Sequence, residues 1–140
     1  QLYISLDAPT EEIYKKIDRP IVKDYWNRLN KTLELLKSFD TRKVLRLTLV
    51  KGINMCNEED YAKLINKSNA DYIELKAYMF VGSSRERLSI ENMPRHNEIK
   101  EFADKICKLT GLKDIDEKED SRVVLLAEKD FRNRKLRLTD

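Results

Sequence analysis

The sequence is poor in the residues that break or cross-link a chain. Its 140 residues include three glycines, three prolines and two cysteines, while 41% are hydrophobic. This composition excludes a disordered or low-complexity protein. Cys56 and Cys107 lie far apart and form no CxxC pair, which excludes a disulfide framework and a zinc site built from this chain alone. Unpaired cysteines favour a reducing, cytoplasmic compartment.

Long apolar runs and a strong excess of one charge are also missing. The longest apolar runs have five residues and the mean hydropathy is −0.64, which excludes a transmembrane helix and predicts no membrane partner. The formal charge of +3 does not by itself identify a nucleic-acid binder. The chain starts Gln1-Leu2-Tyr3-Ile4, without Met or a signal-peptide pattern. Because strand alternation begins at once, we expect a segment of a longer protein.

Strand and helix patterns alternate along the chain. Period-two alternation predicts strands, and apolar stripes at helical spacing predict helices. The expected strands cover residues 2–6, 44–50, 72–80 and 122–126, and the expected helices cover 10–17, 26–36, 57–65 and 96–110. Gly111 suits the end of the last helix, and the acidic stretch 114–120 is expected to be a connection. This order is typical of parallel βαβ units.

The first three expected strands each keep one polar row. These rows are Ser5 and Asp7, then Arg46 and Thr48, then Glu74, Lys76 and Tyr78. A doubly wound sheet would instead have strands that are apolar on both faces. The pattern therefore predicts an α/β fold, the C-terminal half of a partial (β/α) TIM-like barrel of parallel strands, with helices on the outer face and a charged ligand in the lumen. A sheet whose polar face meets solvent or a partner remains an alternative.

The polar rows suggest several chemical roles. Arg46 and Lys76 suit a carboxylate or a phosphate, while Asp7 or Glu74 suits a ribose hydroxyl or an amino group. Lys76 could also act as a Schiff-base nucleophile. The alternative is that Glu74 and Lys76 simply pair with Arg46 or with each other.

A set of motifs carries the interpretation further. They are residues 2–9, 14–20, 45–52, 73–82, 84–89, 91–94, His96 and 121–126. Together they resemble the later half of the tRNA 4-demethylwyosine synthases, the radical S-adenosyl-L-methionine enzymes of wyosine and wybutosine biosynthesis. The resemblance implies that residues 1–140 form the C-terminal portion of a radical SAM barrel plus the family's C-terminal extension.

The resemblance also implies an activity. Family members are lyases that condense N1-methylguanosine of tRNA-Phe with pyruvate to form 4-demethylwyosine, using S-adenosyl-L-methionine and [4Fe–4S] clusters. By motif position, the implied cofactor-binding residues are Ser5, Asp7, Arg46, Thr48, Lys51, Asn54, Glu74, Lys76, Tyr78 and Met79. The residues implied to contact the tRNA anticodon loop are Arg19, Arg85, Arg87 and Arg95.

One departure from the family pattern is large. The CxxxCxxC motif of the radical-generating cluster is absent, and so is the proposed pyruvate-binding lysine. We therefore expect no metal ligands in this segment, and we expect the N-terminal half of the same enzyme to hold the clusters, so that this segment is inactive alone. Two other functions stay open: a non-catalytic RNA-binding module that uses Arg85 and Arg87, and an aldolase-type Schiff-base lyase that uses Lys76.

Overall fold

Three adjacent parallel strands form one side of the sheet in the structure, a computed structural model that describes residues 1–18, 24–80 and 88–128. They belong to a five-stranded sheet with the order β1-β2-β3-β5-β4. The strands are β1 (Leu2–Ser5), β2 (Lys43–Leu49), β3 (Tyr72–Ala77), β4 (Lys113–Lys118) and β5 (Val123–Ala127). The helices are α1 (Glu11–Asp18), α2 (Tyr25–Leu35), α3 (Glu58–Ser68) and α4 (His96–Thr110), with short 3-10 helices η1 (Leu36–Ser38) and η3 (Ile90–Asn92).

The helices begin and end where local chemistry favours it. The Ile13 amide donates a hydrogen bond to Thr10 Oγ1 (3.3 Å) at the start of α1, as expected for an N-terminal cap. Helix α4 ends at Gly111, whose φ of +80° is a conformation that glycine adopts without steric cost. Asn57 precedes α3 as predicted, but it makes no side-chain cap bond and adopts a left-handed conformation.

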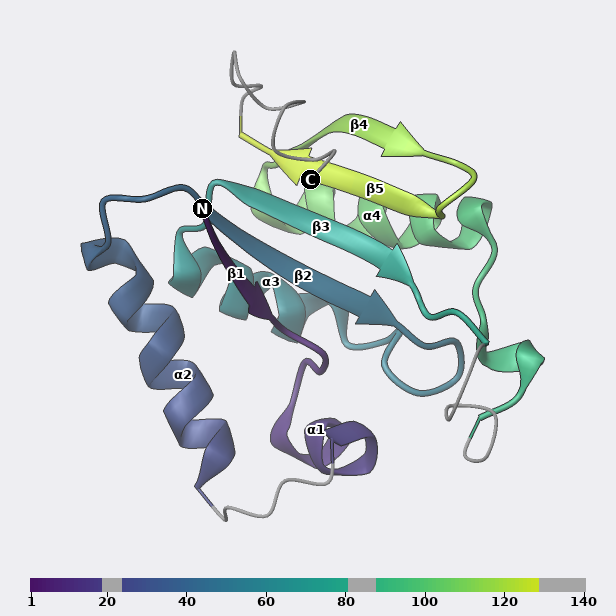
Figure 1. Ribbon diagram of the computed structural model, residues 1–140, viewed down its shortest axis with the longest axis horizontal. Coiled ribbons are helices and arrows are strands. Elements are labelled where there is room, and N and C mark those ends of the chain that lie inside the picture. The colour runs from purple at the N-terminus through teal and green to yellow at the C-terminus, as the bar shows by residue number, and fades with distance from the viewer. Residues whose placement is uncertain (19–23, 81–87, 129–140) are drawn as a thin grey trace.

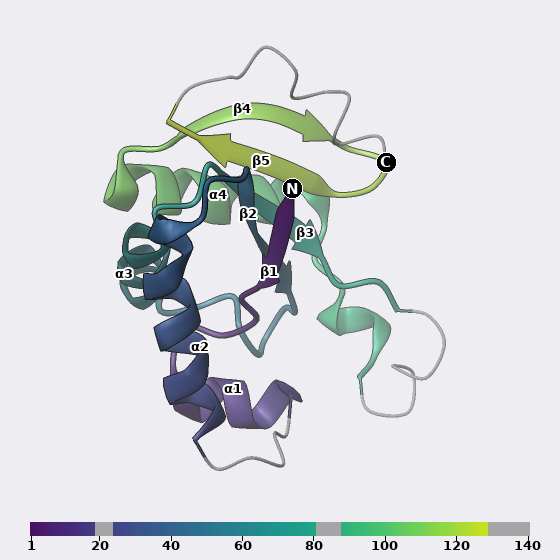
Figure 2. The same ribbon diagram turned by 60° about the vertical axis from the view of Figure 1, so that its left-hand side comes forward.

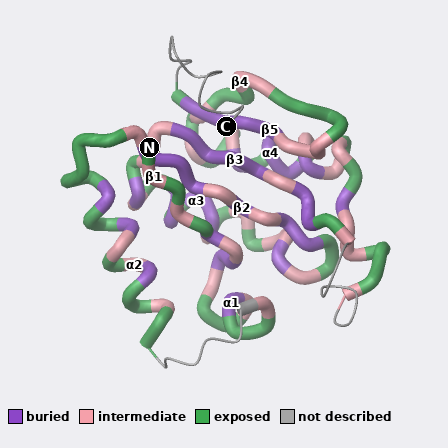
Figure 3. Tube along the Cα trace, viewed as in Figure 1, coloured by how far each residue is buried: buried purple, intermediate pink, exposed green. Residues whose placement is uncertain are grey.

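Helices α3 and α4 cover one face of the sheet. Figure 1 looks onto the other face, with α3 and α4 behind the strands, and Figure 2 shows the layers from the side. Leucines of β2 and β3 point to the helical side and are fully buried, as are Ile99 and Ile106 of α4. Figure 3 shows the buried positions following the central strands. Each fully buried aliphatic side chain contributes about 2 kcal/mol, so this layer supplies most of the driving force for folding.

The helix-free face is apolar at one end and polar at the other. Near the amino ends of β2 and β3, Val44 and Tyr72 form a small buried cluster with Leu125 and Ala127 of β5. The polar residues lie further along the same strands, toward their carboxyl ends. The lumen-like face is therefore polar only where parallel strands usually present a ligand site.

The expectation of parallel strands throughout is wrong for the last two. Strand β5 runs antiparallel to β3, and β4 runs antiparallel to β5. Most of the stretch 114–120, expected to be a connection, belongs to strand β4, which covers residues 113–118. A short turn joins β4 to β5, with the Arg122 amide bonded to the Glu119 carbonyl (3.0 Å), and strands joined this tightly can only pair antiparallel. The fold is therefore mixed α/β, and a barrel remains a prediction.

Along the described ranges, no helix combines the length and the apolar character needed to cross a membrane.

Candidate functional site

The predicted polar rows share one face of the sheet. In the register of the parallel strands, Ser5 lies beside Arg46, and Arg46 beside Glu74. Thr48 lies beside Lys76 one step nearer the carboxyl ends. Because neighbours in register point to the same side, these side chains gather on the helix-free face, as predicted. We call these five residues the polar face.

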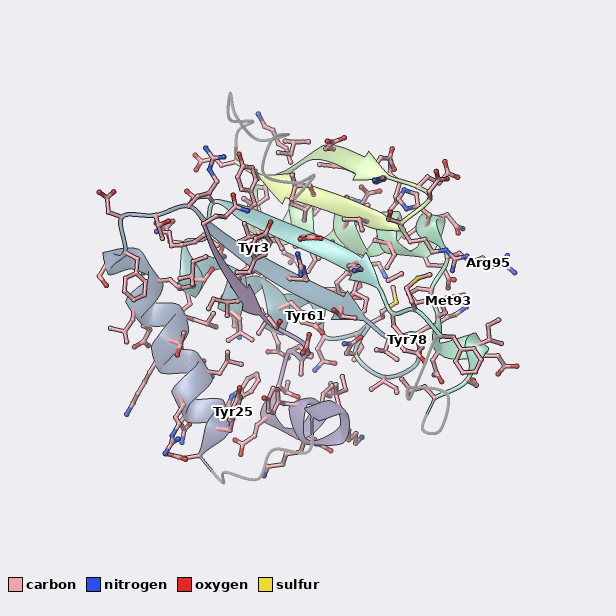
Figure 4. The ribbon with its side chains drawn as sticks, viewed as in Figure 1. Tyr3, Tyr25, Tyr61, Tyr78, Met93 and Arg95 are labelled. Atoms are coloured by element: carbon pink, nitrogen blue, oxygen red, sulfur yellow. The ribbon has the colours of Figure 1, made fainter. Side chains whose placement is uncertain are left out.

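Arg46 and Glu74 form an ion pair within the polar face. Arg46 Nε lies 3.1 Å from Glu74 Oε2, and the Glu74 side chain is only 11% exposed. The Arg46 guanidinium also lies over the Tyr3 ring, 4.7 Å from its centroid, a favourable cation–π distance. Figure 4 labels Tyr3 on β1. The pairing alternative is therefore confirmed for Glu74, and the charge of Arg46 is largely neutralised.

Lys76 is in a different situation. It is half-buried, and within residues 1–18, 24–80 and 88–128 its ammonium makes no hydrogen bond or ion pair. The neighbouring Thr48 is also half-buried. A partly desolvated cation without a counter-charge is stabilised by a bound anion. Lys76 is thus the residue of the polar face best able to bind an anionic group.

Asn54 links the carboxyl ends of β1 and β2. Its side chain is fully buried, and its amide nitrogen donates to the carbonyl oxygens of Asp7 and Thr48, both at 2.8 Å. Its side-chain oxygen accepts from the Val50 amide at 2.6 Å, and the Tyr61 hydroxyl donates to its backbone oxygen at 2.9 Å. Both amide N–H groups are used, so Asn54 fixes the geometry of the strand ends.

Burial raises the pKa of the Tyr61 hydroxyl well above its ordinary value, with nearby Cys56, Asp7 and Glu58 adding to the effect. Tyr61 therefore stays a neutral donor to Asn54, and the link between the strand ends is insensitive to pH over the physiological range.

The loop after β2 is held by the start of α4. Lys51 Nζ lies 2.8 Å from Glu98 Oε2. The hydrogen bond from Lys51, followed by that from the Arg95 amide, lowers the pKa of Glu98. The same loop is also joined to η3 by two hydrogen bonds. The Lys51 amide donates to the Asn92 carbonyl (2.8 Å), and Asn92 Nδ2 donates to the Lys51 carbonyl (2.9 Å).

Strand β3 ends earlier than predicted. It stops at Ala77 rather than Phe80. The last hydrogen bonds that continue its pairing run from the Tyr78 amide to the Leu49 carbonyl (2.9 Å) and from the Ala77 amide to the Arg122 carbonyl (3.0 Å). Tyr78 is buried and Met79 is 40% exposed. Figure 4 labels Tyr78 beyond the end of β3.

The other predicted site residues are more dispersed. Asp7 is half-buried and Ser5 exposed, both at the end of β1. Arg95 is exposed at the start of α4, near Met93 (Figure 4). Arg19, Arg85 and Arg87 lie outside the described residues.

The described part of the chain fits no metal centre. Cys56 and Cys107 are free and half-buried, and burial raises the pKa of both thiols, which disfavours the thiolate that binds metal. No three His, Cys, Asp or Glu residues of the described ranges are grouped so that they could hold a metal ion.

Sequence reasoning missed three contributors to this region. Tyr3 could have been found, because it shares the face of Ser5 in the alternation of β1. Asn92 and Arg122 gave no such signal, because both lie outside the strands, where no alternation indicates the direction of a side chain. Arg122, whose φ is +53°, donates from Nη1 to the Pro94 carbonyl (2.9 Å).

Comparison with protein families gives a match over the second half of the chain. A family model described as "Wyosine base formation" matches residues 67–128, a stretch that includes β3, α4, β4 and β5.

Curated relatives extend the similarity over most of the chain. An S-adenosyl-L-methionine-dependent tRNA 4-demethylwyosine synthase from Pyrococcus abyssi is 51% identical over 131 residues, covering 93% of this chain and 38% of that protein. The synthase TYW1 of Homo sapiens is 39% identical over 134 residues, covering 94% of this chain and 18% of that protein. The chain thus spans well under half the length of the curated relatives it matches.

Two solved structures are similar in fold and sequence. A structure described as TYW1 with a lysine–pyruvate adduct bound has a TM-score of 0.82 and 38% identity, covering 91% of this chain and 40% of that chain. A crystal structure of archaeal TYW1 has a TM-score of 0.73 and 34% identity, covering 91% of this chain and 39% of that chain.

Proposed function

The chain belongs to the tRNA 4-demethylwyosine synthase family, and on this premise we propose that it forms the cofactor-binding and tRNA-facing part of such an enzyme. The observation that carries the proposal is the polar face, where Lys76 lies beside Thr48 near the carboxyl ends of three parallel strands and has no ion-pair partner among the described residues. Parallel α/β folds usually bind their ligands at this end. The cytoplasm, where tRNA is available, is the proposed compartment.

The proposed reaction condenses N1-methylguanosine of tRNA-Phe with two carbons of pyruvate, forming 4-demethylwyosine. The lysine–pyruvate adduct described for the similar solved structure supports pyruvate as the co-substrate. When bound, S-adenosyl-L-methionine together with a [4Fe–4S] cluster would supply the radical that this chemistry needs. The described residues do not fit a cluster, so we place the clusters on a part of the enzyme outside this chain.

The side chains of the polar face fit S-adenosyl-L-methionine better. The cofactor carries a carboxylate and a ribose, and the polar face offers an ammonium from Lys76 and hydroxyls from Ser5 and Thr48. Arg46, held by Glu74 and Tyr3, forms a rigid side of this site. Asn54 maintains the spacing of the strand ends from which Asp7 and Lys51 extend.

The tRNA would approach from the loop side of these strands. Arg95 is exposed there, and guanidinium groups pair with phosphates and stack on unpaired bases. Arg19, Arg85 and Arg87 are proposed to extend this basic surface.

The function is tested with the full-length protein after cluster reconstitution. It is incubated with tRNA-Phe carrying N1-methylguanosine, S-adenosyl-L-methionine, pyruvate and a reductant, and the nucleosides are analysed by mass spectrometry. We expect 4-demethylwyosine only when all components are present, with much less product from Lys76→Ala and wild-type amounts from Lys63→Ala, an exposed lysine of α3. Absence of product from the reconstituted wild-type protein would contradict the proposal.

A lyase that uses Lys76 as its nucleophile is the second candidate, favoured by the lack of an ion-pair partner for Lys76 among the described residues. Borohydride reduction in the presence of pyruvate separates the two functions. The first function predicts no added mass on Lys76, whereas a trapped adduct on this residue would favour the lyase.

A further inference from the structure

A second binding region lies beside the polar face. A cleft of about 700 Å³ is enclosed by the loop after β2, by η3 and by the start of α4; we call it the α4 cleft. Its volume is within the range of about 300–1,000 Å³ that ligand pockets occupy. We infer that the α4 cleft binds one unstacked nucleotide of single-stranded RNA. This inference rests on the proposed function, because the RNA is the tRNA whose neighbouring base reacts at the polar face.

The charges that line the cleft favour an anion. Lys51, Arg95 and Arg122 face two carboxylates, Glu91 and Glu98. Both oxygens of Glu98 are already engaged, one by the Arg95 amide (3.0 Å) and one by Lys51 Nζ (2.8 Å). The remaining balance is positive, as binding of a phosphodiester requires.

Two of the three cations are placed to reach a phosphate. Arg95 is exposed, and its side chain forms no ion pair within the described ranges. Figure 4 shows it at the rim of the molecule. The Lys51 side chain is 52% exposed, and an ammonium has three donors, so its bond to Glu98 leaves it able to contact a second anion. Arg122 is instead held in the wall by its bond to the Pro94 carbonyl.

An apolar wall accounts for the preference for an unstacked nucleotide. Ile90 and Met93 also line the cleft, and Ile90 is 61% exposed. The flat face of a base that has left its stack gains by packing against apolar side chains. Bases in a duplex are covered on both faces and cannot make this contact.

The cleft is also preorganised. The paired hydrogen bonds between Lys51 and Asn92 join two of its sides, so a ligand need not order the loop. Lys51 lies two residues after the end of β2, which places the α4 cleft at the same end of the strands as the polar face. A nucleotide bound there would hold the anticodon loop while the adjacent base enters the site.

The test measures RNA binding by the full-length protein without turnover. The probe is a fluorescently labelled RNA hairpin with an anticodon loop, titrated at several salt concentrations, and the comparison probe is a duplex of equal length. Arg95→Ala removes the side chain but leaves the amide that caps α4. Glu91→Lys adds a cation at the same cleft, and Lys63→Ala is the control.

For the hairpin, we expect Arg95→Ala to weaken binding roughly fivefold and to reduce the salt slope by about one. Glu91→Lys should tighten binding, and Lys63→Ala should have no effect. If neither Arg95→Ala nor Glu91→Lys changes hairpin binding, the inference that the α4 cleft binds RNA is wrong, while the proposed function still stands. If the substitutions change the binding of hairpin and duplex equally, the inference that the cleft binds an unstacked nucleotide is wrong. A wild-type protein that binds neither RNA would overturn the proposed function as well.

Discussion

At the scale of single residues, Asn54 has the greatest influence on the candidate site. Its one side chain makes three hydrogen bonds to backbone groups of two strand ends. No other side chain of the same size can replace this buried amide, because the side chain must donate two hydrogen bonds and accept one. The position of Asp7 and Lys51 therefore depends on a residue that need not touch any ligand.

Asn54→Asp tests this role. The carboxylate would face the carbonyl oxygens of Asp7 and Thr48 without a proton to donate, and we expect a loss of roughly 3 kcal/mol in the free energy of unfolding. Chemical denaturation of the full-length protein measures it. Asn66→Asp, an exposed site on α3, is the control, and equal stability of the two variants would contradict the role.

Glu98 gives a prediction on pH. Its pKa is lowered from the ordinary value of 4.5 in the folded state, so its stabilising effect is complete above that value and is lost as the pH falls through the lower, folded-state pKa. Glu98→Gln should cost roughly 1 kcal/mol at neutral pH. The difference from wild type should disappear in acid.

The measurement is denaturation of both proteins over a pH series, with Glu101→Gln on the exposed side of α4 as the control. A difference that persists below the folded-state pKa would mean that Glu98 acts by shape rather than by charge.

The alternation of polar and apolar residues predicted which side chains share the polar face, but it did not predict which of them form ion pairs. Alternation alone placed Arg46, Glu74 and Lys76 together. It could not decide between an Arg46–Lys76 anion site and an Arg46–Glu74 pair, because that depends on the register between β2 and β3, which the sequence of neither strand specifies.

At the scale of elements, helix α4 illustrates how local signals determine a boundary. Its apolar stripe and Gly111 predicted both its course and its end, because a helix end that needs a left-handed residue strongly favours glycine. Strand β4 shows the opposite. Its sequence is acidic, and only pairing with β5 makes it a strand, so no local pattern predicts it.

Gly111→Ala tests the helix end. No atom lies within 4 Å of the added Cβ, so the cost comes only from the backbone, with φ at +80°, and should be about 1 kcal/mol. Thermal denaturation measures it. The matched variant is Asn69→Gly, at a left-handed C-cap of α3, which should be neutral or stabilising. An unchanged Gly111→Ala melting temperature would contradict this account.

At the scale of the whole molecule, the edge of β1 is incomplete. Within the described residues β1 pairs only with β2. Beside it lies a mainly apolar groove of about 480 Å³, lined by Leu2, Ile4, Leu36 and Phe39 among others. An uncovered strand edge next to apolar side chains favours pairing with another chain.

Residues 1–140 expressed alone should therefore self-associate and be poorly soluble. Sedimentation velocity over a concentration series measures the association, and a charge placed on the edge by Ile4→Lys should reduce it. A soluble monomer with a sharp two-state melt would contradict the prediction.

The central claim is that the polar face binds S-adenosyl-L-methionine through Lys76. Calorimetric titration of the cofactor into the full-length protein, compared with Lys76→Ala and Lys63→Ala, tests it most directly. We predict a Kd at least about tenfold weaker for Lys76→Ala, a loss of about 1.4 kcal/mol, and no change for Lys63→Ala. Equal affinities of all three proteins would contradict the claim.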